Sequence, residues 1–378
     1  MEILTGATVY TPLEVLRPGT VYIEGGRIAK VFLGVDKSGE NLEGKIIGPG
    51  LVDLHIHGLK GHDVNTGTAE ALLSLARELV RYGVTAFIPT AVTAPHEELL
   101  RISKAVAEAV ELQRAGEKGA RILGLELEGP YINPERRGAQ NPEFIRPPNW
   151  KEFLEYWRAS NGKIRTITVA PELPGALAFI EKVRSLGVVV SLGHTNATYE
   201  EAKAAILTGA TRITHLFNAM PPIHHRCPGI VLASLESRMH LGIIADLVHI
   251  SAPVLRFVWK VSGRGRIFLM SDAISAAGLE DGYYSLGGLK VQVRSGVARL
   301  TDGTLAGSTL TMDQAIRNLL AIDIPLMDSW IMGSYTPAQA CREPSIGLLR
   351  PGMMADLVVL DAENLKVERV YVGGQRLL

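Results

Sequence analysis

The stretch IIGPGLVDLHIHG, residues 46–58, decides the fold of this chain. It opens with a Gly-Pro-Gly turn, continues in an apolar run and ends with two histidines one residue apart, His55 and His57. Side chains in a β-strand alternate between faces, so residues i and i+2 point the same way. We therefore predict a short buried strand whose carboxyl end presents two imidazoles. Imidazoles are common ligands of divalent metals, and a strand that simply ends in two polar residues is the alternative.

The composition favours one large domain beside a small one. The chain has 378 residues, 47% hydrophobic content, and 39 basic and 39 acidic residues. Barrels of alternating strands and helices commonly take about 250 residues. The balanced charge argues against a nucleic-acid partner and a membrane surface, because both normally require a basic excess. No apolar stretch reaches the roughly 18 residues of a membrane span.

The N-terminus and the cysteines indicate a cytoplasmic protein. Residues 1–15 have neither a positively charged start nor a long apolar core, so they do not read as a signal peptide. Cys227 and Cys341 are far apart and show no paired spacing, which fits a reducing compartment.

An α/β fold follows from apolar strands that alternate with helical segments. Helical periodicity is clearest over residues 69–82, 96–115 and 198–207. Eight such units predict a (β/α)8 TIM-type barrel over residues 49–344. The eight strands are expected at 51–57, 85–92, 122–128, 164–170, 188–194, 212–218, 241–250 and 267–272.

The two ends of the chain have a different character. Residues 1–48 and 345–378 contain short β-type runs separated by turns such as Gly25-Gly26 and Gly373-Gly374. We expect both termini to build one small β-sandwich domain.

Polar residues gather where the predicted barrel strands end. In a TIM-type barrel, chemistry takes place at the carboxyl ends of the strands. These ends carry His55 and His57 on the first strand and Glu128, His194, His215, Asn218, His249 and Asp272 on later ones. Strand 164–170 is the exception, because it ends without a ligand or a lysine.

Glu128, His194 and His215 form a candidate catalytic metal site. Together they offer one oxygen and two nitrogens and leave a position for water, which is the layout of a catalytic metal. Strand alternation places Glu126 on the same face as Glu128, so one of the two should point into the barrel mouth. A solvated carboxylate and two core histidines are the alternative.

Asp272, at the end of the last strand, is the candidate acid and base. A carboxylate there can accept a proton from an attacking water and pass it to a leaving group. The alternative is that Asp272 caps a following helix.

Several motifs carry a family resemblance. PGLVDLHIHG, LELEGPYINPERRGAQNPE, GHTNAT, THLFNAMPPIHHR, IIADLVHIS, SDAISAAGLEDG and DGTLAGSTLTM occur in this order. Together they resemble the amidohydrolase superfamily and, within it, the N-acetylglucosamine-6-phosphate deacetylases. The likeness covers about residues 46–320 and the flanking β-domain.

The resemblance implies a function and a site. It implies hydrolysis of the acetamide of an amino sugar phosphate in a homodimer, with Glu128, His194 and His215 as the main metal site and Asp272 as the acid and base. Zn or Fe is the implied metal, and His55 and His57 allow a second ion. The implied substrate contacts are Ala139, Gln140, Asn218, Ala219, Arg226, His249, Leu305, Ala306 and Gly307.

Arg226 and Gln140 are implied contacts whose hydrogen-bond donors differ in charge. Arg226 suits a phosphate, because a planar guanidinium offers five donors. Gln140 stands where family members usually have histidine, so it can give a developing oxyanion only a neutral donor. The resemblance also leaves room for a phosphate contact that is donated across a dimer interface.

Three other functions stay open at this stage. The substrate can be the galactosamine epimer. A cyclic amide is a second possibility, but enzymes of that kind use a carboxylated lysine on the fourth strand, where only Lys163 precedes the strand. A barrel that binds a sugar phosphate without cleaving it is the third, and such proteins usually lose a ligand or the base.

Overall fold

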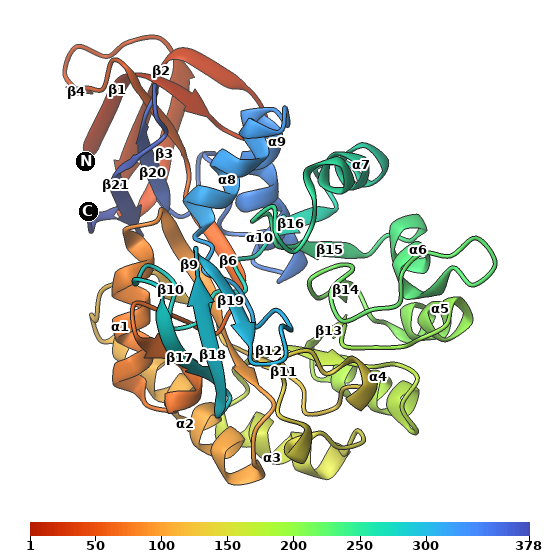
Figure 1. Ribbon diagram of the computed structural model, residues 1–378. Helices are drawn as coiled ribbons and strands as arrows, with labels where there is room; N and C mark the ends of the chain where they lie inside the picture. Colours follow the sequence, from red (N-terminus) through yellow and green to blue (C-terminus); the bar gives the residue numbers. More distant parts are fainter.

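Eight parallel strands form a barrel, as the alternation of apolar and helical segments predicts. The computed structural model describes residues 1–378, and Figure 1 shows the barrel beside a smaller sheet domain. Neighbouring strands pair in parallel in the order β6, β9, β11, β12, β13, β14, β15 and β16. Their bounds are β6 (Leu51–Ile56), β9 (Val84–Val92), β11 (Leu125–Glu128), β12 (Ile164–Val169), β13 (Val189–Leu192), β14 (Arg212–Ile213), β15 (His240–Ile243) and β16 (Ile267–Leu269), with β10 (Arg121–Ile122) also on β9.

The ring closes through the residues that follow β16. The Asp272 amide donates to the His55 carbonyl at 3.0 Å, and the His57 amide donates to the Ala273 carbonyl at 2.8 Å. Two side chains with predicted roles on the first strand therefore lie directly beside the predicted acid and base on the last.

Helices cover the outside of the barrel (Figure 1). Three of them confirm the predicted segments: α1 (Ala69–Val80), α2 (His96–Arg114) and α5 (Tyr199–Thr208). The others are α3 (Trp150–Ala159), α4 (Ala176–Ser185), α6 (Gly229–Glu236), α7 (Ala252–Ser262), α8 (Met312–Ala321), α9 (Leu326–Gly333) and α10 (Tyr335–Ala340). None of them is both long and apolar enough to cross a membrane.

Capping residues fix where several helices begin. The Thr68 side chain accepts from the Ala71 amide at the start of α1, and Asn149 caps α3. Thr198 and Glu201 form a capping box at α5, which satisfies amides that lack a partner in the first turn. No helix follows Asp272, so the alternative reading of this residue as a helix cap is wrong.

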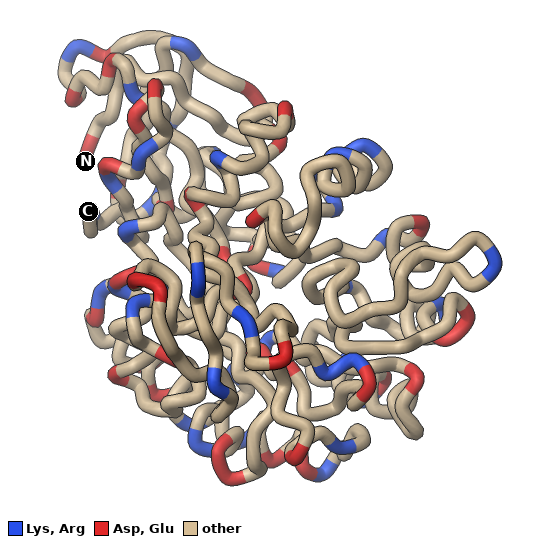
Figure 2. Tube along the Cα trace, viewed as in Figure 1, with Lys and Arg blue, Asp and Glu red and all other residues tan.

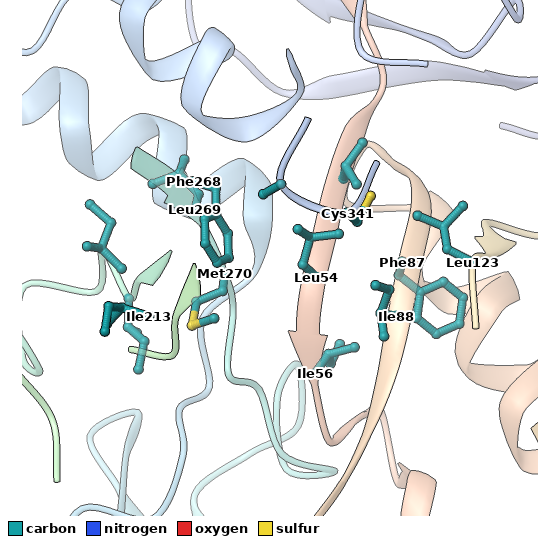
Figure 3. Close-up of a cluster of buried hydrophobic side chains, with 14 of the residues drawn as sticks. Leu54, Ile56, Phe87, Ile88, Leu123, Ile213, Phe268, Leu269, Met270 and Cys341 are labelled. Atoms are coloured by element: carbon teal, nitrogen blue, oxygen red, sulfur yellow. The ribbon is translucent and has the colours of Figure 1, made fainter. Parts of the chain in front are cut away.

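A large apolar cluster includes the first strand of the barrel. Leu54 and Ile56 on β6 lie between Phe87 and Ile88 on one side and the Phe268–Met270 segment on the other (Figure 3). These side chains belong to one buried cluster of 84 residues. The core holds the strands in register and so fixes the positions of their carboxyl ends.

Both termini enter the same small sheet, as predicted. It has the order β22-β21-β20-β5-β1-β2-β3, with β4 also on β1, and its buried side chains form a separate cluster. The bounds are β1 (Glu2–Tyr10), β2 (Val15–Glu24), β3 (Arg27–Leu33), β4 (Glu40–Asn41), β5 (Lys45–Pro49), β20 (Leu357–Asp361), β21 (Val367–Val372) and β22 (Gln375–Arg376).

An inserted sheet was not predicted from the sequence. Strands β17 (Gly282–Leu286), β18 (Leu289–Arg294) and β19 (Val297–Leu300) form an antiparallel sheet between β16 and α8. A short pair, β7 (Gly58–Leu59) and β8 (His62–Asp63), follows β6. Basic and acidic residues are interspersed along the trace (Figure 2), in keeping with the balanced composition.

Trp330 joins the barrel to the small sheet. Its ring is buried, its indole N–H donates to the Pro49 carbonyl at 2.9 Å, and it stacks on Tyr10 with 5.5 Å between the ring centroids. A Cβ atom at Gly48 would lie 2.1 Å from the Trp330 ring, so only glycine fits at this point of β5.

We predict that Gly48→Ala lowers the free energy of unfolding by about 2–3 kcal/mol, because the new methyl overpacks the junction. Gly265→Ala is the matched control, since a Cβ there meets no atom within 4 Å. Chemical denaturation of the two variants and the wild type measures the difference. Equal stability of all three would contradict the close contact with Trp330.

Candidate active site

A cavity of about 510 Å³ opens at the carboxyl ends of the barrel strands. The lining side chains come from most of the predicted strand ends and from the loops that follow them. They are His57, Pro134, Glu135, Arg136, Arg137, Gly138, Ala139, Gln140, Glu128, His194, His215, Asn218, Ala219, His249, Asp272, Leu286, Asp302, Thr304, Leu305 and Gly307.

Three chemically important residues of this cavity have an unusual backbone. His194, His215 and Asp272 have φ angles of 48°, 31° and 50°, in a region that non-glycine residues rarely adopt. Such conformations persist only where the surrounding structure enforces them, and they gather at functional sites. Here the chain turns sharply as each strand ends, which directs these side chains into the mouth of the barrel.

Glu128 is the centre of the first group of donor atoms. Its Oε1 lies 3.0 Å from His194 Nε2 and 2.9 Å from His215 Nε2, and the two ring nitrogens are 3.2 Å apart. All three side chains are buried. This is the oxygen and two nitrogens that the sequence predicts.

His55, His57 and Asp272 form a second group beside the first. Asp272 Oδ1 lies 3.0 Å from His57 Nε2 and 3.3 Å from His55 Nε2. The same two nitrogens lie 3.4 Å and 3.5 Å from the carboxylate oxygens of Glu128. Glu128 therefore stands between the two groups and is within reach of both.

Two histidines are held so that Nε2 faces the carboxylates. His57 Nδ1 donates to the Thr90 carbonyl at 3.0 Å, and His194 Nδ1 donates to the Arg136 carbonyl at 2.8 Å. A backbone acceptor at Nδ1 fixes the ring orientation and leaves Nε2 for a metal.

The buried carboxylates and histidines of the site shift one another's pKa values. Burial by itself lowers the pKa of His57, but hydrogen bonds to Asp272 and Glu128 outweigh burial and raise it to about 10. Burial raises the pKa of Asp272, yet His55 and His57 hold that pKa well below its usual range. Without an ion, protonated imidazoles balance the buried carboxylates, and a divalent cation can replace those protons.

The residues fit a divalent metal. The buried Nε2 atom of His55 faces the carboxylates of Glu128 and Asp272 and has no hydrogen-bond partner. Buried polar atoms normally have partners, so this cluster needs a further group. Two sets of residues each offer three donor atoms that lie within 4.8 Å of one another. One set is Glu128, His194 and His215, and the other is His55, His57 and Asp272. Imidazole and carboxylate donors with room for water suit a catalytic divalent ion.

Glu126 and Glu128 both face the barrel interior. Glu128 reaches the cavity, whereas Glu126 lies deeper, is fully buried and approaches His55 Nδ1 at 3.4 Å. The expectation that one of them points into the mouth therefore applies to Glu128. Burial raises the pKa of Glu126, but the nearby His55 and Arg212 lower it below the usual range.

The Gln140 side chain is hydrogen-bonded to Glu128. Its Nε2 donates to Glu128 Oε2 at 2.6 Å, and its Oε1 accepts from the Thr93 amide at 2.7 Å. One amide hydrogen is thus engaged with Glu128, which leaves the other for a bound molecule.

The other predicted substrate contacts divide into three groups. Ala139, Asn218, Ala219, His249, Leu305 and Gly307 line the cavity. Ala306 is buried behind its wall, as is His55, which was predicted as a donor for a second ion. Arg226 lies elsewhere, on an exposed loop before α6, where its guanidinium lies 2.7 Å from His225 Nε2. A single subunit does not bring Arg226 to its own cavity.

One wall of the cavity consists of residues for which the sequence predicts no role. Glu135, Arg136 and Arg137 line it, together with Asp302 and Thr304 from the loop after β19. A signal was present, because two consecutive cations directly precede Gly138, Ala139 and Gln140. The loop is also structural, since the Arg136 carbonyl and the Gln140 amide support two of the donor residues.

Comparison with known proteins agrees with this geometry. The amidohydrolase family model matches residues 46–377. The N-acetylglucosamine-6-phosphate deacetylase of Vibrio furnissii is 36% identical over 86% of this chain and 82% of its own, and the N-acetylgalactosamine-6-phosphate deacetylase of Escherichia coli O157:H7 is 37% identical over 88% of each. A solved structure of a mutant N-acetyl-D-glucosamine-6-phosphate deacetylase from Mycobacterium smegmatis, in complex with N-acetyl-D-glucosamine-6-phosphate, has a TM-score of 0.94 and 38% identity and covers 100% of this chain and 99% of its own.

We predict that Glu128→Gln removes most of the bound divalent metal, because the neutral amide replaces the carboxylate that both donor groups share. Metal analysis of purified protein gives the metal-to-protein ratio. His62→Ala is the control, since His62 lies outside the cavity lining. A Glu128→Gln variant with the wild-type ratio would contradict this assignment.

Proposed function

This chain belongs to the amidohydrolase family, and we propose that it hydrolyses the acetamide of N-acetylglucosamine 6-phosphate to acetate and glucosamine 6-phosphate. The observation that carries this proposal is the buried Glu128 carboxylate within hydrogen-bonding distance of His194 and His215, with Asp272 beside it. Relatives that are 36–38% identical over most of their length have this activity in their names.

A divalent metal is part of the proposal. Glu128, His194 and His215 would hold the main ion, with Zn or Fe as the expected element, and His55, His57 and Asp272 provide donors for a second. Bound there, such an ion would lower the pKa of a water towards about 7 and would polarise a carbonyl.

Asp272 acts as the base and then as the acid. Its carboxylate lines the cavity beside the first donor group. It takes the proton of the attacking water as the new carbon–oxygen bond forms. It then gives this proton to the amide nitrogen as the carbon–nitrogen bond breaks, because an amide nitrogen leaves poorly as an anion.

Other cavity residues orient the substrate. The free amide hydrogen of Gln140 is a neutral donor for the developing oxyanion. Asn218, His249 and the loop at Leu305–Gly307 offer polar groups and backbone to the sugar phosphate. Binding energy gathered far from the acetamide is then used to position it.

We propose a homodimer in which Arg226 reaches the phosphate in the partner's cavity. Arg226 is exposed and lies outside its own cavity. Helix α7 follows in the same part of the fold and leaves an apolar stripe uncovered, with Val254, Phe257 and Val261 exposed to 36%, 50% and 50%. Residues at this spacing share one helix face, which suits contact with a second copy.

Two rival substrates are distinguished by particular residues. The galactosamine epimer remains a second candidate, because a relative named for it is 37% identical. A cyclic amide is disfavoured, because β12 carries no lysine at its carboxyl end and Lys163 lies before the strand, 4.0 Å from Glu111. A non-catalytic barrel is disfavoured because all four central residues are present.

We also propose a cytoplasmic location. Cys227 and Cys341 are both free thiols, as expected in a reducing compartment.

We expect metal-loaded protein to release acetate from N-acetylglucosamine 6-phosphate far faster than from unphosphorylated N-acetylglucosamine. The phosphate contacts supply binding energy only to the first sugar. The galactosamine epimer, assayed in parallel, tests the second candidate. Equal rates of acetate release with and without the phosphate would contradict the proposed phosphate contacts. Absence of acetate release from any of the sugars would contradict the proposed reaction.

Mixing two inactive variants tests the shared site. Asp272→Asn lacks the base and Arg226→Met lacks the phosphate contact, so each alone should be nearly inactive. If Arg226 serves the partner's cavity, each mixed dimer has one intact site, and random reassociation restores about a quarter of wild-type activity. Each variant dissociated and reassociated alone is the control. No recovery in proven mixed dimers would show that Arg226 acts in its own subunit.

A further inference from the structure

A buried ion pair lies beneath the metal-ligand groups. Glu126 on β11 and Arg212 on β14 are both fully buried, and Arg212 Nη2 lies 3.6 Å from Glu126 Oε2. The guanidinium also donates through Nη1 to Thr166 Oγ1 at 2.9 Å and lies 4.8 Å from the centre of the Phe268 ring. Both charges therefore occupy the interior of the barrel below the cavity.

Glu126 connects this pair to His55. Its Oε2 is 3.4 Å from His55 Nδ1, while Oε1 accepts from Thr168 Oγ1 at 3.0 Å. On the other side of the same ring, His55 Nε2 faces Asp272 at 3.3 Å and Glu128 at 3.5 Å. His55 thus stands between a carboxylate below it and two carboxylates in front of it.

The other histidines explain what Glu126 does. His57 and His194 each place Nδ1 on a backbone carbonyl and turn Nε2 towards the carboxylates. Glu126 Oε2 occupies the corresponding place at His55, 3.4 Å from Nδ1. A carboxylate at this nitrogen fixes the ring orientation and makes the opposite nitrogen a better metal donor.

Stability alone does not account for these charges. Replacing a buried ion pair by apolar residues of similar volume is often neutral or stabilising, whereas removing one partner is costly. The Phe268 ring packs against Arg212, so an apolar side chain of similar volume suits this position. The pair therefore calls for a role in the site above it.

We propose that Glu126 and Arg212 are positioning residues that hold His55 with Nε2 presented to a divalent ion. Glu126 contacts the ring at Nδ1, and Arg212 keeps the Glu126 carboxylate in place. This inference rests on the metal chemistry of the proposed function and adds two residues that touch neither the substrate nor the ion.

The test compares metal binding with folding. Arg212→Met alone leaves Glu126 buried and unpaired, so the decisive variant is the double change Glu126→Leu with Arg212→Met, with His55→Ala as the benchmark. Zn²⁺ content and affinity are measured by metal analysis and chelator competition, and folding is measured by thermal unfolding. Glu126→Gln keeps an acceptor oxygen for His55 but removes the counter-charge of Arg212, so its metal affinity is compared once thermal unfolding shows that it folds.

We expect the double variant to fold and to reproduce the metal loss of His55→Ala, with roughly 10- to 100-fold weaker binding of the affected ion. Glu126→Gln should retain most of the affinity. The double change Arg165→Met with Glu343→Leu removes another ion pair, 2.5 Å apart and outside the cavity lining, and should leave metal binding unchanged.

Wild-type affinity in a folded double variant, with loss in His55→Ala, would overturn the positioning role and leave the proposed function standing. Identical metal binding in all variants would overturn it as well, because His55 would then not be a ligand. A wild-type protein that binds no divalent ion would overturn the metal chemistry of the proposed function itself.

Discussion

The Glu128 carboxylate is the group on which the rest of the site depends. It is buried, it accepts from His194 and His215, and it lies within 3.5 Å of both His55 and His57. A buried carboxylate is costly unless it is paired. Three strands, β6, β13 and β14, place four imidazoles around it, and imidazole donors suit a divalent ion.

The barrel is the means by which distant residues meet at this carboxylate. Asp272 and His55 are far apart in the sequence but share a backbone hydrogen bond where the ring closes. Tight turns direct the side chains of His194, His215 and Asp272 inward, and these residues adopt unfavourable backbone conformations with positive φ angles. Glu126 and Arg212 are buried charged residues that lie below this cavity in the interior of the barrel, next to the threonines Thr166 and Thr168.

Periodicity was sufficient to predict the barrel, because apolar strands and amphipathic helices alternate clearly along residues 49–344. It could not predict that β14 stops at Ile213, since the turn that follows depends on contacts with neighbouring strands. The sheet β17–β19 was missed because its alternation of buried and exposed residues is short and partly solvated. The division of the chain at residues 48 and 345 stays a prediction.

The site was predictable to the extent that it lies on strand ends. The cavity residues that could not be predicted lie on loops. Arg136 and Arg137 line the cavity from a loop whose path is set by hydrogen bonds to Glu128 and His194. Gln140 has a carboxylate partner that no spacing rule reveals. Arg226 lies on a loop directed away from its own cavity, so its predicted contact depends on a second subunit that one chain does not describe.

The most direct test of the account is anomalous diffraction from crystals of zinc-loaded protein. We predict the strongest anomalous peak at a distance of about 2.0–2.3 Å from a Glu128 carboxylate oxygen and from the Nε2 atoms of His194 and His215. A strongest peak away from Glu128, or none in protein that is saturated with zinc, would contradict the account.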